Sequence, residues 1–430
     1  ELAVRNQVEI RMMSLDQMVP ENHLVRDVVS FVESLDLSEL YESIKSKNGH
    51  VGRTPIDPRI LFSLWLFATL EGETSGRRIA KLTERDTIYM YLCGGVSVNY
   101  HTICDFRVQH GELLKRILTD SIAVLHSTGF IKLETIAQDG MRVRASAGSS
   151  SFRRDKSLHE ARVKAEEYLK ELNDRDEDDD LPPGQQASRR RAAEDKLARI
   201  NEACEQMIDL KKRHEERNRH KSAKDRTSEP RASTTDPDAR RMKMGDTGFR
   251  PAYNVQFGSD ADALVIVDVD VTNEGTDSGQ LEPMYERICS QYGSKPKNYL
   301  ADGGFRSQPG VTALETNGTR FFGPLPREKQ QLAGGEDPYA ARAKENAKFT
   351  AYRARMGTEE AKAMYSRRAA AAEFPNANCR NQGLHQFRVR GKLQAKAESL
   401  WQALAYNFRR FCNLKIADSQ QTMMQYLLTN

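Results

Sequence analysis

Three acidic residues set far apart in the chain have neighbours that favour a shared site. Asp139 lies in the string TIAQDGMRVRASA, Asp302 in NYLADGGF and Glu373 in RRAAAAEFPNANCRNQG. The first two follow apolar, strand-forming runs, and the third lies in an alanine-rich stretch that favours a helix. Three carboxylates that converge at one edge of a sheet would bind a divalent cation, and Mg²⁺ or Mn²⁺ is the ion expected for oxygen ligands.

Such a site suits the cleavage of phosphodiesters, which are anionic and repel a hydroxide nucleophile. Two metal ions about 3.5–4 Å apart overcome this repulsion, because one generates the nucleophile and the other stabilises the leaving oxygen. The alternative for each acid taken alone is an ordinary solvated side chain, since the chain has 61 Asp and Glu residues and Asp commonly begins a turn after a strand. The assignment therefore depends on the elements around the three acids.

The surrounding sequence predicts a mixed α/β core. The predicted strands cover 135–139, 251–257, 263–272, 298–302 and 321–325, with 143–147 as a hairpin partner of the first and a helix over 277–291. One acid then lies on the first strand and the next at the end of the fourth. A long region rich in Ala, Arg and Lys follows, and it brings Glu373 on a helix that can pack across the sheet.

This order of acids and elements resembles the DDE insertion-sequence transposases, whose catalytic core is an RNase H-like mixed sheet. In that family one Asp lies on the first strand, another follows the fourth strand, and a Glu lies on a late helix. Asp139, Asp302 and Glu373 match these positions. The strings GRTPIDPRILFSLWLFATLEGETSGRRIAKL and LCGGVSVNYHTICDFRVQH resemble the helical N-terminal domain of one branch of the family, and QFRVRGKLQAKAESLWQALAYNFRRF resembles its closing segment.

The family also carries a Tyr, Arg, Glu, Lys/Arg series around the glutamate, and here the series is Tyr365, Arg368, Glu373 and Arg380. It departs from the commonest form in two ways. Four residues instead of three separate Arg368 from Glu373, which makes Arg367 a competitor for the arginine position. Arg380 replaces the usual lysine, which keeps the charge but presents a planar fork of donors in place of a point charge.

The resemblance implies an enzyme that uses two Mg²⁺ or Mn²⁺ ions, held by the three acids, to cut double-stranded DNA at the ends of a bacterial mobile element. It would then transfer the freed 3′-hydroxyl into target DNA, with Tyr365, Arg368 and Arg380 holding phosphates. Joining two ends requires two active sites, so a homodimer assembled on DNA is expected. Two alternatives stay open: a metal-dependent RNase H-like nuclease without strand transfer, and a domesticated DNA-binding protein without catalysis.

Residues 1–128 are predicted to form an all-helical N-terminal domain. Ile60, Leu61, Leu64 and Phe67 fall at helical spacing after a Pro-Arg start that suits the first turn of a helix. The basic residues expected to reach phosphates or base edges of DNA are Arg77, Arg78, Lys81 and Arg107. The alternative is a dimerisation or packing module whose basic face is simply solvated.

The catalytic core is expected in two pieces, 129–154 with the first strands and 233–430 with the remaining strands and the C-terminal helices. Between them, 155–232 has apolar residues at steps of three and four on both sides of DRDEDDDLPPGQQ, which predicts a helical hairpin with an acidic tip inserted after the first strand. The second arm continues into the basic tract KKRHEERNRHKSAKDR. That tract is either solvated or a grip on the DNA backbone.

Asp277 is a fourth acid near the predicted core. Its position predicts a cap for the helix that follows, with Gln280 completing a capping box, in preference to a metal ligand. The net charge of +4 is only mildly basic, so DNA binding must depend on local clusters. Six scattered Cys, no apolar run that could span a membrane and no signal peptide lead us to expect a cytoplasmic bacterial protein, associated with the nucleoid when bound to DNA.

Overall fold

The chain folds into two compact units, Glu1–His110 and Gly111–Asn430. The computed structural model describes residues 12–42, 44, 55–174, 182–222, 224–225 and 227–429. The division lies at His110 instead of residue 128, because helix α8 (Gly111–Ser127) packs with the second unit. Its buried apolar face contacts helix α17 (Lys392–Thr429) and strand β6 (Ile266–Thr272).

The first unit is helical throughout its described part. Its helices are α1 (Leu15–Met18), α2 (Leu24–Ser34), α3 (Ser38–Glu42), α4 (Pro58–Leu70), α5 (Gly76–Leu82), α6 (Thr87–Cys93) and α7 (Tyr100–Gln109). Helix α4 is its centre: Asp57 caps the first turn, Pro58 occupies it, and nearly every later side chain is buried. Trp65 donates its indole N–H to the Ile103 carbonyl at 2.7 Å, which ties α4 to α7.

The second unit contains a six-stranded mixed sheet. Its strands are β1 (Thr135–Arg144), β4 (Arg240–Lys243), β5 (Phe249–Asp260), β6, β7 (Asn298–Leu300) and β8 (Arg320–Phe322). Strand β5 is antiparallel to β1 on one side and to β4 and then β6 on the other, while β7 and β8 run parallel to β1. The order β6–β5–β1–β7–β8 makes β1, which carries Asp139, the neighbour of β7, which ends just before Asp302.

Strand β1 is a single strand, so the predicted hairpin between 135–139 and 143–147 is wrong. Gly140 stays in the ladder opposite Gln256, and Met141 and Val143 beyond it are buried. The pair Asp139-Gly140 has the composition of a turn. Within a strand, glycine instead marks a place where another group comes close to the backbone.

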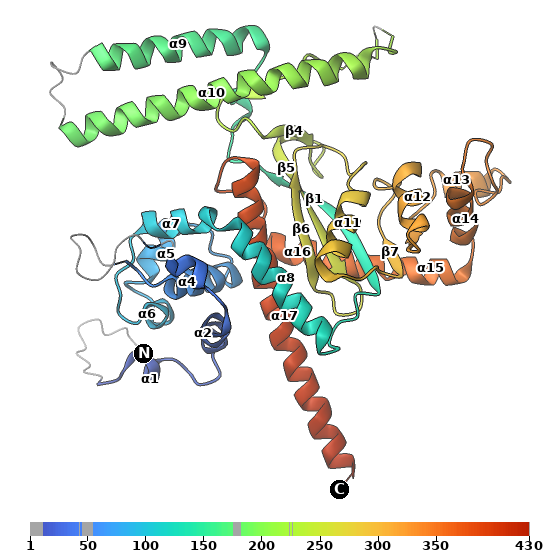
Figure 1. Ribbon diagram of the computed structural model, residues 1–430, viewed down its shortest axis with the longest axis horizontal. Helices are drawn as coiled ribbons and strands as arrows, with labels where there is room; N and C mark the ends of the chain where they lie inside the picture. Colours follow the sequence, from blue (N-terminus) through green and yellow to red (C-terminus); the bar gives the residue numbers. More distant parts are fainter. Residues whose placement is uncertain are drawn as a thin grey trace, which may run out of the picture. The chain divides into compact units, whose positions relative to one another are not determined.

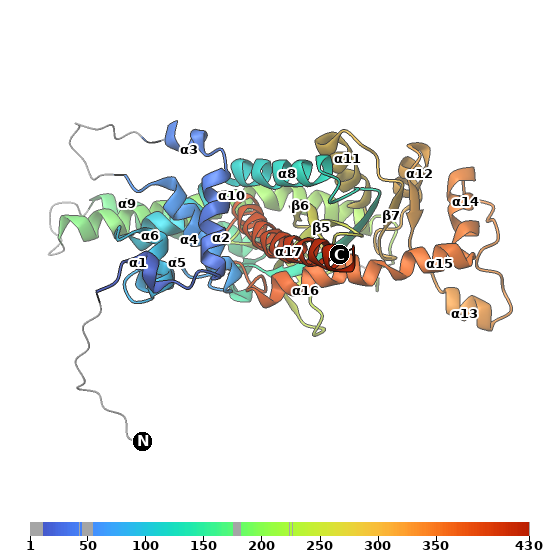
Figure 2. The same cartoon turned by 90° about the horizontal axis from the view of Figure 1, so that it is seen from below.

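Helices cover the sheet and enclose an apolar core that includes Tyr299, Phe321 and Tyr352. Besides α8 and α17 they are α11 (Leu281–Tyr292), α12 (Gln308–Thr316), α13 (Glu328–Ala333), α14 (Ala347–Met356), α15 (Glu359–Ser366) and α16 (Phe374–Asn381). Figure 2 shows α11 and α16 on opposite sides of β5 and β6. No helix in the described ranges is both long and apolar enough to cross a membrane.

Two long helices, α9 (Asp155–Asp174) and α10 (Pro183–Asn218), lie side by side between β1 and β5 in the chain (Figure 1). Leu158, Ile200 and Met207 form a small buried core between them. At the base of this α9–α10 arm, β2 (Phe152–Arg153), preceded by the short helix η1 (Ser149–Ser151), pairs with β3 (Ala232–Ser233). Most of the predicted acidic tip, 175–181, lies outside the described residues.

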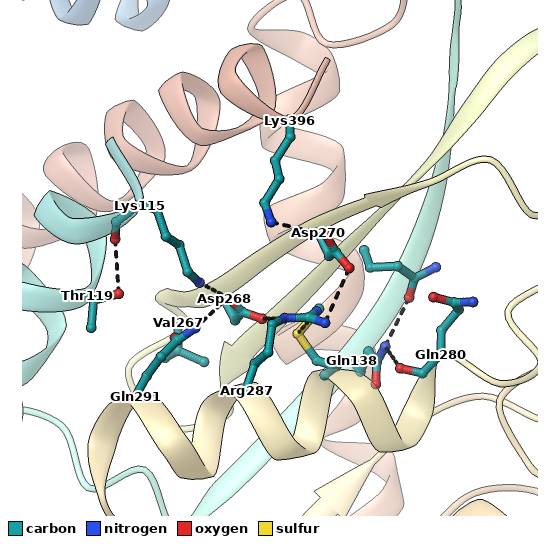
Figure 3. Close-up of polar contacts among 12 residues, drawn as sticks. Lys115, Thr119, Gln138, Val267, Asp268, Asp270, Gln280, Arg287, Gln291 and Lys396 are labelled. Carbon is teal, nitrogen blue, oxygen red and sulfur yellow. Dashed lines mark hydrogen bonds and ion pairs between the residues drawn. The ribbon is translucent and has the colours of Figure 1, made fainter. Parts of the chain in front are cut away.

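A buried ionic network joins α8, α11 and α17 to β6 (Figure 3). Asp268 is fully buried and pairs with Lys115 and with Arg287, whose Nε lies 2.9 Å from Asp268 Oδ2. Arg287 Nη1 and Lys396 Nζ each lie 3.3 Å from a carboxylate oxygen of Asp270. Burial lowers the pKa of Lys115, and the Asp268 carboxylate opposes that shift. We call this the Asp268 network.

Candidate active site

Asp139 lies on β1, and Asp302 follows the neighbouring parallel strand β7. In the ladder between β1 and β7, Ala137 pairs with Leu300. Each acid follows its member of that pair by two residues; Asp139 is still within β1, and Asp302 lies two residues beyond the end of β7. The structure therefore brings together two acids between which most strands of the sheet lie in the chain.

The Asp139 carboxylate is largely buried and has two side-chain donors. Its side chain is 17% exposed. Oδ2 accepts a hydrogen bond from Asn376 Nδ2 at 2.8 Å, and Oδ1 accepts one from Arg368 Nη2 at 3.2 Å. Burial raises the pKa of Asp139 to about 6; Arg368 opposes this rise and the Asp302 charge adds to it. A carboxyl group with such a pKa gives up its proton near neutral pH.

Glu373 reaches the same place through an irregular helical turn. It ends η2 (Ala369–Glu373), a π-helical turn that precedes α16. A π turn closes over five residues instead of four, so residues five apart lie on one face. Arg368 Nη1 lies 3.0 Å from Glu373 Oε1, while Nη2 of the same guanidinium contacts Asp139. The π turn thus absorbs the extra residue in the Arg–Glu spacing.

Arg368, not Arg367, is the arginine beside the acids. Arg367 pairs with Asp262 instead. Tyr365, at the end of α15, is half-buried; burial raises its pKa and the Arg368 guanidinium lowers it, which places the phenol next to this arginine. Arg380 is exposed in the last turn of α16, and no ion pair links it to another described residue.

The predicted capping role of Asp277 is wrong. Helix α11 begins after Gln280, whose side chain makes no capping bond. Asp277 Oδ1 instead accepts hydrogen bonds from Asn254 Nδ2 at 2.7 Å and Gln256 Nε2 at 2.8 Å. Both donors are buried residues of β5. Spacing along the chain could not reveal them, because they precede Asp277 by a whole strand.

Asp277 is a fourth carboxylate at the site. A Cβ atom on Gly140, the residue after Asp139, would lie 2.1 Å from Asp277 Oδ1. A Cβ atom on Gly304, whose N–H binds Asp302 Oδ1 at 2.7 Å, would lie 3.7 Å from Asp277 Oδ2. Gly140 therefore makes room for Asp277, and Gly304 lies between Asp277 and Asp302.

The donor set has the chemistry that a hard divalent cation requires. Beside the carboxylates, Asn254 Oδ1 and Asn376 Oδ1 are buried amide oxygens without a hydrogen-bond partner. Among the described residues, no group of three or more His, Cys, Asp or Glu side chains is arranged to hold a metal ion. The guanidinium of Arg368 supplies the positive charge that Asp139 and Glu373 share.

In the helical unit, Arg77 and Lys81 are exposed on α5 and line a hollow of about 580 Å³ together with Tyr100. The Arg77 guanidinium lies 5.0 Å from the centre of the Tyr100 ring. Arg78 is also exposed and pairs with Glu73 at 2.9 Å. These three cations remain accessible to an anionic partner.

Arg107 differs from the other predicted DNA-binding residues because it is buried. Its guanidinium lies 4.9 Å from the centre of the Trp65 ring and donates to the Thr74 carbonyl at 3.0 Å. Arg107 therefore packs the interior of the helical unit, and we remove it from the residues expected to face DNA.

Two family models match the chain. Residues 13–109 match the family described as Transposase domain (DUF772), and residues 217–408 match the family described as Transposase DDE domain. Asp302 and Glu373 fall within the second range, whereas Asp139 and the α9–α10 arm up to residue 216 lie between the two. No curated protein and no solved structure matches the chain.

A helical transposase domain followed by a DDE domain defines a transposase. The chain belongs to the DDE insertion-sequence transposases, which confirms the resemblance seen in its sequence. Members of this family are enzymes of DNA transposition and bind transposon ends.

Proposed function

We propose that this protein cuts phosphodiester bonds at the ends of its mobile element and transfers the freed 3′-hydroxyl into target DNA. Asp139, Asp302 and Glu373 are the proposed catalytic acids. The observation that carries the proposal is their convergence: one acid lies on β1, the next follows the adjacent parallel strand β7, and the third is joined to Asp139 through Arg368. Sequence order alone would not require any of these contacts.

The core is proposed to be RNase H-like. The support is the strand order β6–β5–β1–β7–β8, in which β5 runs antiparallel to both of its neighbours, β6 and β1, and the last two strands run parallel to β1. Helix α11 connects β6 to β7, as the family pattern of three strands, a helix and a strand requires. The α9–α10 arm would then be an insertion after the first strand of this core.

Two Mg²⁺ or Mn²⁺ ions held by the three acids would activate the nucleophile and stabilise the leaving oxygen. Arg368 would leave the carboxylates as the ions arrive and would turn to a phosphate of the DNA, with Tyr365 and Arg380 at neighbouring phosphates. Asn376 would keep Asp139 oriented, because its amide N–H already binds Oδ2. Asp277 would hold Asn254 and Gln256 in place beneath the site.

The partner is proposed to be double-stranded DNA, both transposon ends and target, bound by a homodimer so that two active sites act on two ends. Arg77, Arg78 and Lys81 of the helical unit are the proposed contacts to the ends. Their exposure supports this role, since phosphate contacts require accessible cations.

The proposal is tested by Mg²⁺- or Mn²⁺-dependent cleavage and joining of DNA that carries the ends flanking the gene. Wild type is compared with Asp139→Asn, Asp302→Asn and Glu373→Gln, and with Asp262→Asn as a control carboxylate outside the site. We expect the three site variants to bind DNA but neither cut nor join it. Cutting without joining by wild type would favour a nuclease, binding without cutting would favour a domesticated binding protein, and activity that survives a site substitution would refute that assignment.

A further inference from the structure

A basic groove lies where the C-terminal half of α10 meets β4 and the loop after β6. Figure 1 shows α10 passing beside β4. The groove encloses about 850 Å³. Its charged lining consists mainly of cations: Arg213, Arg217, Arg231, Arg240, Arg241 and Lys243, with two acids, Glu229 and Glu274, and the imidazole of His214. Such an excess of positive charge creates a potential that attracts polyanions.

Two of these cations fasten α10 to the core. Arg213 Nη1 lies 2.7 Å from Glu274 Oε1, and Arg240 Nη2 donates to Gln206 Oε1 at 2.6 Å. Gln206 in turn donates to Asp238 Oδ1 at 2.8 Å. The walls of the groove are therefore held together by charged and polar contacts that cross from α10 to the strands.

The other cations are available for a ligand. Arg217, Arg231, Arg241 and Lys243 are exposed and form no ion pair with any other described residue. Cations gathered in one hollow repel one another, so an anion that neutralises several of them at once gains more than it would at isolated surface charges.

Phe249 distinguishes this groove from an ordinary solvated basic face. It lines the groove opposite Lys243 in the β4–β5 ladder, and it is 57% exposed. A solvated basic face is accounted for by Arg and Lys alone, whereas this groove also exposes an aromatic ring among its cations. Single-stranded nucleic acids bind surfaces of this composition, because cations contact the backbone and aromatic rings stack on bases.

The groove ends next to the candidate active site. Gly275 and Thr276 line it, and the next residue is Asp277. Arg142, three residues after Asp139 on β1, donates from Nη2 to the Gly275 carbonyl at 2.9 Å. A chain of nucleotides in the groove would thus have one end near the four carboxylates.

We propose that the basic groove binds a single DNA strand that leads into the active site. Arg217, Arg231, Arg241 and Lys243 contact its phosphates, and Phe249 stacks on an unpaired base. This proposal rests on the proposed function, which supplies DNA as the ligand. It also gives the α9–α10 arm a role, since α10 supplies one wall of the groove.

The first test measures the salt dependence of DNA binding by fluorescence anisotropy, with the full-length protein and a labelled 30-nucleotide single strand. Arg217→Gln, Arg241→Gln and Lys243→Gln are combined in one variant. The matched control combines Lys164→Gln, Lys170→Gln and Lys196→Gln, which removes three exposed charges from the α9–α10 arm outside the groove. The groove variant is expected to weaken binding about tenfold or more and to lower the slope of log K against log salt by about 2, since each lost phosphate contact removes about 0.7.

The second test separates stacking from charge. Phe249→Ala is expected to weaken binding of the single strand about fivefold or more without changing the salt slope, and Phe249→Tyr is expected to restore it. Binding of a 30-base-pair duplex by Phe249→Ala should change less. An unchanged single-strand affinity in Phe249→Ala would overturn the stacking role.

A groove variant that binds with the slope and affinity of the matched control would overturn the proposed groove. The cleavage and joining assay reports on the proposed function independently. Wild type that cuts and joins DNA while the groove variant keeps full affinity would refute the groove alone. Wild type that binds no DNA in either assay would refute both proposals.

Discussion

Two clusters of charge in the second unit use the same residue types in opposite ways. In the Asp268 network a fully buried carboxylate forms ion pairs with Lys115 and Arg287, and the three side chains come from β6, α8 and α11. At the candidate active site Asp139 is also largely buried, but its pKa is raised to about 6 and polar atoms beside it, Asn376 Oδ1 and Arg368 Nε, have no partner. The first cluster is satisfied by the protein itself. The second is incomplete, as expected where a ligand must bind.

The strongest contrast is expected from removing one carboxylate at the site. Asp139→Asn keeps the shape and the burial of the side chain but removes the charge that would hold the metal ions. We expect metal-dependent DNA cleavage to fall by about 10³-fold or more, while the free energy of unfolding at pH 7 stays equal to wild type or rises. Single-turnover cleavage and urea unfolding measure the two effects. A folded variant with more than a tenth of wild-type cleavage would contradict the assignment.

The Asp268 network should respond in the reverse sense. Asp268→Ala leaves the largely buried Lys115 without its carboxylate partner and leaves Arg287 only its contact with Asp270, so we expect the free energy of unfolding to fall by about 3–5 kcal/mol. The control is Asp262→Ala, which breaks the exposed pair with Arg367 and should cost about 1 kcal/mol or less. Urea unfolding measures both. Equal losses in the two variants would mean that burial does not distinguish the network.

A smaller effect concerns the dependence of stability on pH. The pKa of Asp139 is about 6 in the folded protein and 3.8 in its reference state. Between these values the native state binds more protons than the unfolded chain, so the free energy of unfolding falls as pH rises from about 4 to 6, by about 2–3 kcal/mol. Above pH 6 this contribution stays constant.

The measurement is the difference in free energy of unfolding between wild type and Asp139→Asn across this range, without metal and without DNA. The difference isolates Asp139, because Asp236 and Asp260, whose pKa values burial also raises, titrate in both proteins. A difference that does not change between pH 4 and 7 would show that Asp139 is not perturbed.

The smallest expected change tests Arg368 as an internal substitute for a cation. In Arg368→Gln the two carboxylates lose their guanidinium, so we expect Mn²⁺ to bind the DNA-free protein about tenfold more tightly, whereas DNA cleavage falls because the phosphate contact is lost. Arg367→Gln, one residue away and paired with Asp262, should leave Mn²⁺ affinity unchanged. Titration calorimetry provides the measurement. Equal Mn²⁺ affinity in Arg368→Gln and wild type would remove Arg368 from the site.

The strands were the most predictable part of the fold, because their apolar runs are local. The strings PAYNVQF and ALVIVDVDVT lie within or overlap β5 and β6. The end of β1 was not predictable, since Gly140 has the local signature of a turn and its true role depends on Asp277, more than a hundred residues later. The predicted boundary of the helical unit at residue 128 was wrong for the same reason. Helix α8 resembles the helices before it, but the elements that it packs against lie after it in the chain.

The three acids of the candidate site were chosen from local strings, and the structure places them together. The contacts of the residues around these acids were not predictable from the sequence. An alanine run such as AAAAE gives no sign of a π turn, so the sequence does not distinguish Arg367 from Arg368 as the partner of Glu373. Asp277 was assigned to a cap because its true donors, Asn254 and Gln256, belong to β5. Arg107 was assigned to a basic face because a sequence does not show that Trp65 covers it.

The short β2–β3 ladder has a consequence for how the chain reaches its folded state. Strand β1 can pair with β5 only after the whole α9–α10 arm, which lies between them in the chain, has been synthesised. Phe152 pairs with Ser233 at the base of the arm, so the two ends of this long segment are adjacent once the arm has folded on itself. The effective loop between β1 and β5 then no longer includes the arm, which lowers the entropy cost of closing the sheet. We therefore expect the core to tolerate changes in the length of the arm beyond this ladder.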